Sequence, residues 1–68
     1  MIAAHRIDEA QEELIDELRQ RRRQLGWSAR RLARTVGVQP STISRIERRE
    51  RDPSLHTYLK LRLALEDG

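Results

Sequence analysis

The strongest constraint on this chain is a break in its apolar pattern, where one short helical stretch stops at a single glycine. Leu32, Ala33 and Val36 recur at the spacing of one helix face, and Gly37 follows immediately. Glycine adopts the left-handed backbone that ends a helix without a steric cost, and an apolar residue such as Val38 often packs back on the ended helix. The sequence therefore predicts a short helix that ends at Gly37.

A second short helix is predicted from about Pro40 to Arg48, since proline is tolerated at the first helical position. Ile43 and Ile46 lie three residues apart and are expected to face inward. The opposite, polar face is expected to carry Ser41, Thr42 and Arg45. Two helices joined by a glycine turn, with such a polar face, are typical of a helix-turn-helix that reads DNA.

A longer helix is predicted before this pair, from about Glu9 to Gln24, with Asp8 as its N-cap. Residues 1–7 are expected to be a flexible segment and residues 8–68 to be one domain. The predicted apolar stripe of this helix consists of Ile7, Ala10, Leu14, Leu18 and Leu25, with Ile15 at its margin. Ser28 is an N-cap type for the next helix, and Trp27 and Leu32 have the spacing of a hydrophobic staple.

A last helix is predicted from Leu55 to about Leu65, after the break at Asp52-Pro53-Ser54. Its apolar arc spans roughly 180°, wider than a surface helix needs. One row of this arc consists of Leu55, Leu59 and Leu63, and a second row consists of Tyr58, Leu61 and Leu65. We expect the arc to make two contacts, one of them with the core of its own domain.

Charge is distributed unevenly along the 68 residues, which carry a net charge of +3. Residues 19–51 hold eleven arginines against two glutamates, whereas residues 1–18 hold six acids against one arginine. The basic segment 19–51 includes the two predicted short helices, and this coincidence indicates a phosphate-binding patch. The alternative is a solvated surface in an arginine-rich protein, since arginine outnumbers lysine thirteen to one.

The chain resembles the Cro/cI-type (XRE) helix-turn-helix family, which is lambda repressor-like, over roughly two-thirds of its length. The matching residues are Leu18, Arg22, Leu25, Gly26, Ser28, Leu32, Ala33, Gly37, Val38, Thr42, Ile43, Ser44, Arg45, Ile46, Glu47, Pro53, Ser54 and Leu55. The resemblance implies an all-α, compact bundle of four helices that lacks the usual fifth helix. It also implies an ion pair between Arg22 and Glu47, where the alternative is an ordinary exposed arginine. Many relatives carry glycine near position 49, and Arg49 departs from that pattern.

The function that this resemblance implies is sequence-specific binding of double-stranded DNA by a transcriptional regulator. A repressor is the role that we favour. The third helix would lie in the major groove. Base contacts are expected from Pro40, Ser41, Thr42 and Arg45, and phosphate contacts from Arg30, Arg31, Gln39, Arg48, Arg49 and Arg51. The predicted location is the cytoplasm, for a bacterial or phage-encoded protein that is associated with the nucleoid when DNA is bound.

Two other classes of function are alternatives to DNA binding. One is a protein-interaction module, such as an antitoxin-like protein, that binds a partner through its acidic first helix or its wide apolar last helix. The other is an enzyme, which the sequence disfavours because His5 and His56 lack a catalytic constellation. Without cysteine, no thiolate metal site is available, and we expect no cofactor, no metal and no membrane span.

A homodimer is also predicted, through Tyr58, Leu61 and Leu65 as an apolar flank of the last helix that the domain leaves uncovered. The alternative is a monomer, in which the first helix folds across this flank through Ile7 and Ala10.

Overall fold

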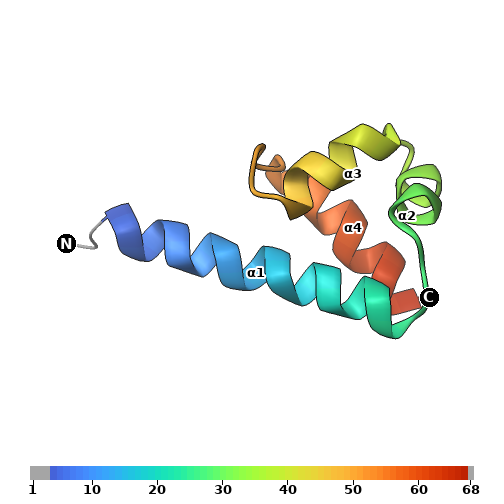
Figure 1. Ribbon diagram of the computed structural model, residues 1–68, viewed down its shortest axis with the longest axis horizontal. Helices are drawn as coiled ribbons and strands as arrows, with labels where there is room; N and C mark the ends of the chain where they lie inside the picture. The colour runs from blue at the N-terminus through green and yellow to red at the C-terminus, as the bar shows by residue number, and fades with distance from the viewer. Residues whose placement is uncertain (1–3, 68) are drawn as a thin grey trace.

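The computed structural model describes residues 4–67 as four α-helices joined by short turns (Figure 1). The helices are α1 (Ala4–Gln24), α2 (Ala29–Val36), α3 (Pro40–Glu47) and α4 (Leu55–Asp67). The predicted all-α bundle of four helices is confirmed. Helices α2, α3 and α4 form a compact group, and only the C-terminal half of α1 runs alongside them (Figure 1).

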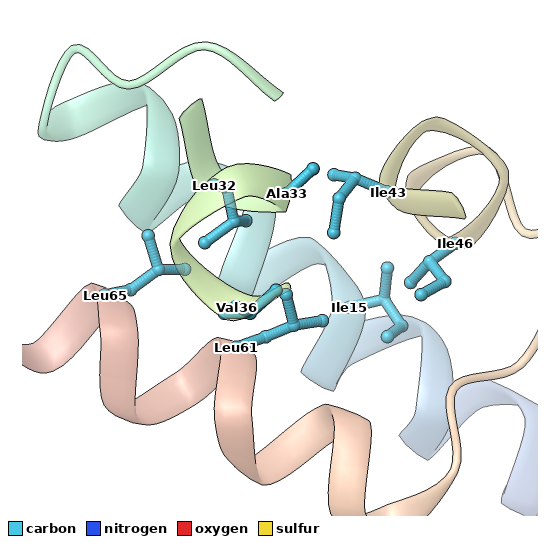
Figure 2. Packing of buried hydrophobic residues seen from close by; sticks show 8 residues of the cluster. All are labelled: Ile15, Leu32, Ala33, Val36, Ile43, Ile46, Leu61 and Leu65. Carbon is cyan, nitrogen blue, oxygen red and sulfur yellow. The ribbon is translucent and has the colours of Figure 1, made fainter. Parts of the chain in front are cut away.

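The core consists of eight apolar side chains that come from all four helices and point toward one another (Figure 2). They are Ile15, Leu32, Ala33, Val36, Ile43, Ile46, Leu61 and Leu65. Helix α2 supplies three of them and lies between α3 and α4 in this cluster. The packing of α2 against α3 therefore fixes how the outer face of α3 is presented.

Helix α1 begins at Ala4, earlier than the predicted Glu9, and Asp8 lies inside the helix instead of capping it. The stretch after Ala4 contains three glutamates and a glutamine between residues 9 and 13, and both residue types favour a helix. Residues 1–3 of the predicted flexible segment lie outside the described residues. Ile15, expected at the margin of the apolar stripe, is the only described residue of α1 that is buried. Ile7 and Leu14 are 51% and 42% exposed, because Ile7 lies on the projecting part of the helix and Leu14 lies at the edge of the globule, beside Tyr58.

The assignment of the two apolar rows of α4 is reversed in the structure. Leu61 and Leu65 lie in the core, so the expectation that they form an exposed dimer flank is wrong. Tyr58 is half-buried beside α1. The exposed row is instead the one that consists of Leu55, Leu59 and Leu63. The helical period predicts how wide an apolar arc is, but only packing against α1 and α2 determines which edge is covered.

The first three helices end in the same turn, in which one residue with a left-handed backbone follows the helix. Gly26 and Gly37 take this position after α1 and α2, with φ of 73° and 80°, and Arg49 takes it after α3 with φ of 67°. After α3 the amide of Arg49 donates to the carbonyl of Ile46 at 3.1 Å, and the amide of Glu50 donates to that of Arg45 at 2.9 Å. Arginine thus occupies a backbone conformation that favours glycine.

Candidate nucleic-acid interface

The turn between α2 and α3 follows from local sequence signals. Helix α2 begins at Ser28, whose Oγ accepts a hydrogen bond from the amide of Arg31 at 3.0 Å. It ends at Gly37, and the amide of Val38 donates back to the carbonyl of Ala33 at 2.9 Å. The chain then passes through the extended Gln39 directly into α3, whose first residue is Pro40. The connection is therefore too short to let α3 rotate independently of α2.

The outer face of α3 lies opposite its two buried isoleucines, Ile43 and Ile46. Ser41 and Arg45 are exposed on this face, and Thr42 is half-buried beside them. Gln39 and Pro40 are exposed at the N-terminal end of the helix. The residues predicted to contact bases therefore share one accessible end and face of a short helix, with a hydroxyl, a methyl and a guanidinium available to base edges.

Two of the predicted phosphate contacts, Arg30 and Arg31, are exposed in the first turn of α2. The guanidinium carbon of Arg31 lies 4.3 Å from the centroid of the Trp27 ring, a cation–π contact that sequence reasoning missed. The four-residue spacing of Trp27 and Arg31 was the available signal. This contact restrains Arg31 at the helix N-terminus, where backbone amides also favour an anion.

Three further arginines follow α3, and acidic side chains hold two of them. Arg48 Nε lies 2.7 Å from Glu50 Oε2, and Arg49 Nη1 lies 3.2 Å from Glu12 Oε1 of helix α1. Arg51, the third, is exposed. Sequence reasoning missed both acids. Glu50 is a near neighbour of Arg48 in the chain, whereas the contact with Glu12 depends on tertiary packing and leaves no local signal.

The predicted ion pair between Arg22 and Glu47 is present and has two parallel hydrogen bonds. Arg22 Nε donates to Glu47 Oε2 and Arg22 Nη2 donates to Glu47 Oε1, each at 2.7 Å. Arg22 Nη1 also donates to the carbonyl of Trp27 at 2.8 Å. Only 12% and 14% of the two side chains are exposed. The hydrogen bond to Glu47 raises the pKa of Arg22 above its ordinary value, although burial opposes this.

This ion pair links three parts of the domain. Arg22 lies near the end of α1, Trp27 precedes α2, and Glu47 is the last residue of α3. The pair therefore fixes the C-terminal end of α3 relative to α1, and its geometry is that of a planar, bidentate arginine–carboxylate contact. Its role is to position the outer face of α3 without contributing to that face.

Two findings in the part of the chain that the structure describes concern metal clusters and membrane-spanning helices. Residues 4–67 contain no group of three or more His, Cys, Asp or Glu side chains arranged to hold a metal ion. None of their helices has the length and apolar character needed to cross a membrane.

A two-helix unit with a glycine turn, an exposed polar face on its second helix and a buried ion pair behind that helix defines a helix-turn-helix domain. The sequence matches the profile of the Helix-turn-helix family over residues 18–66, and the chain belongs to this family, of the Cro/cI (XRE) type. It is also 42% identical over 52 residues to the HTH-type transcriptional regulator SutR of Escherichia coli (strain K12). That match covers 76% of this chain and 29% of the relative, so the chain spans less than a third of the relative's length. No solved structure gives a significant match.

Proposed function

We propose that this domain binds double-stranded DNA in a sequence-specific manner and acts in transcriptional regulation, as a repressor, in the bacterial cytoplasm. The observation that carries the proposal is the outer face of α3. Its exposed polar side chains lie opposite two buried isoleucines, on a helix that the α2 turn and the Arg22–Glu47 pair hold in place. A helix presented in this way fits the major groove. The name of the E. coli relative supports the regulatory role.

Arg45 is the residue that we expect to specify sequence. Arg45 is exposed in the last turn of α3 and is the longest side chain of the outer face, and a guanidinium pairs with guanine O6 and N7 through two hydrogen bonds. Ser41, Thr42 and Pro40 would add contacts to base edges and thymine methyl groups.

Affinity would come from phosphate contacts on both sides of α3. Gln39, Arg30 and Arg31 lie on its N-terminal side, and Arg48, Arg49 and Arg51 lie on its C-terminal side. Because arginines at both ends would neutralise phosphates, binding should weaken steeply as salt is raised.

The experiment is to select bound duplexes from a random pool and then to measure affinity for the selected site at several salt concentrations. We expect wild type to select a defined motif. Arg45→Ala should lose about 1–3 kcal/mol on that motif and relax preference at one base position. Arg62→Ala is the matched control, since it removes an exposed arginine on α4, away from α3, and should change neither value. Recovery of no motif, or binding that ignores salt, would contradict the proposal. Equal losses on all sequences would reassign Arg45 to a phosphate.

A further inference from the structure

The N-terminal half of α1 projects from the globule (Figure 1). Near the base of this projection Glu12 pairs with Arg49, and Leu14 lines a hollow with Leu55 of α4. We call residues 4–14 of α1 the arm. Every residue of the arm is exposed, and the first buried residue of α1 is Ile15. Along one side of the arm runs an apolar row that consists of Ile7, Ala10 and Leu14. These three residues line the same shallow hollow of about 470 Å³.

The helical state of the arm needs a source of stability. The packed C-terminal half of α1 provides the helical nucleus, so the arm needs only propagation, but its outer turns gain little from packing and are expected to fray in water. Exposed leucine and isoleucine on one side of it add surface that water disfavours. An arm that stays helical is therefore expected to bury its apolar row against another molecule.

We propose that the arm pairs in an antiparallel manner with the arm of a second copy of this chain, and that the two copies form a C2 dimer through α1. The apolar row is suited to such pairing. When two arms cross with Ala10 at the two-fold axis, Ile7 of one copy lies beside Leu14 of the other, and the small Ala10 side chains let the helices approach closely.

Charge along the edge of this row indicates the same pairing. Arg6 lies at one end of the edge, and Glu13 and Glu17 lie two and three helical turns further on. Arg6 lines the hollow beside Ile7, and Glu17 lines the next hollow beside Leu14. Within the described residues these three side chains form no ion pair. An antiparallel crossing about Ala10 brings Arg6 of each copy between Glu13 and Glu17 of the other.

The apolar and charge patterns thus share one two-fold centre, which favours a second copy over an unrelated partner. A uniformly basic partner helix would instead place like charge against Arg6. At Leu14 the hollow also continues to Leu55 and Tyr58 of α4. Ile7 of the second copy would be seated at this junction.

The first test is sedimentation of the full chain over a concentration series, with far-UV circular dichroism at each concentration. Wild type should shift from monomer to dimer, and its helix content should rise in parallel as the arms become ordered. Leu14→Glu should weaken the dimer at least about tenfold, because each dimer buries this side chain twice. Leu63→Glu is the matched control, since it replaces an exposed leucine on α4 outside the arm and should leave the dimer intact.

Two further variants test the antiparallel geometry. Arg6→Glu alone should weaken the dimer, and adding Glu13→Arg and Glu17→Arg in the same chain should restore its affinity. The natural chain has no cysteine, so Ala10→Cys introduces a single thiol at the proposed axis. This variant should form a disulfide-linked dimer on oxidation, whereas Gln24→Cys, at the far end of α1, should not.

The proposal is overturned if wild type remains a monomer throughout the series. It is also overturned if the dimer forms but tolerates Leu14→Glu, or if the charge exchange fails to restore it while circular dichroism shows folded protein. None of these measurements involves DNA, so the outcome is independent of the proposed DNA binding.

Discussion

In the turn after α3, replacing Arg49 by glycine should stabilise the protein. Arg49 has φ of 67°, where a Cβ atom costs about 1–2 kcal/mol. Arg49→Gly removes that strain but adds about 0.5–1 kcal/mol of backbone entropy to the unfolded chain. It also removes the ion pair with Glu12, whose side chain is more than half exposed, so that this loss is at most about 0.5 kcal/mol.

The balance of these contributions is a net gain of about 0.5 kcal/mol in the free energy of unfolding, which corresponds to a rise of about 2–4 °C in Tm for a domain of this size. Thermal unfolding followed by circular dichroism measures it. Glu12→Gln is the control for the ion pair and should lower Tm only slightly. In the Glu12→Gln background the gain from Arg49→Gly should be larger, because the ion pair is already absent.

Gly37 supplies the opposite experiment in the same domain. It has φ of 80°, and a Cβ atom built there would meet no atom within 4 Å. Gly37→Ala therefore adds strain without a clash and should destabilise the fold by about 0.5–1 kcal/mol.

One outcome would refute the reasoning on Arg49. If Arg49→Gly lowers Tm while Glu12→Gln leaves it unchanged, the left-handed backbone at Arg49 does not cost the fold the free energy assigned to it.

Two further predictions concern the ion pairs around α3. Glu47→Gln should destabilise the fold by about 2 kcal/mol, since it removes the negative charge and one of the two acceptor oxygens that face the shielded Arg22. A double-mutant cycle with Arg22→Met should show strong coupling, and additive small effects would mean that the pair contributes little. Glu50→Gln should release Arg48 for phosphate binding, so that the slope of the logarithm of DNA affinity against the logarithm of salt concentration becomes steeper by about 0.9. Glu66→Gln on α4 is the control and should leave this slope unchanged. Equal slopes for the two variants would place Arg48 away from the DNA.

The sequence by itself determined the features that depend on neighbours in the chain. The serine before α2, the glycine after it and the proline that opens α3 each act within one turn of backbone, and the structure places all three as predicted. The inward direction of Ile43 and Ile46 follows from the same local period, and it also orients the polar face of α3. The Arg22–Glu47 pair was available only through the family resemblance, because its partners lie on different helices.

Only the tertiary structure decided which edge of each amphipathic helix is covered. Along α4 the two apolar rows are equally good by period, and the choice of Leu61 and Leu65 over Leu59 and Leu63 depends on where α1 and α2 lie. Along α1 the period predicts a continuous stripe, yet the globule covers Leu14 only in part and leaves Ile7 half exposed. The contact of Glu12 with Arg49 belongs to the same class. Helical periodicity gives a direction around one helix, whereas burial depends on the position and length of its neighbours, which no local pattern encodes.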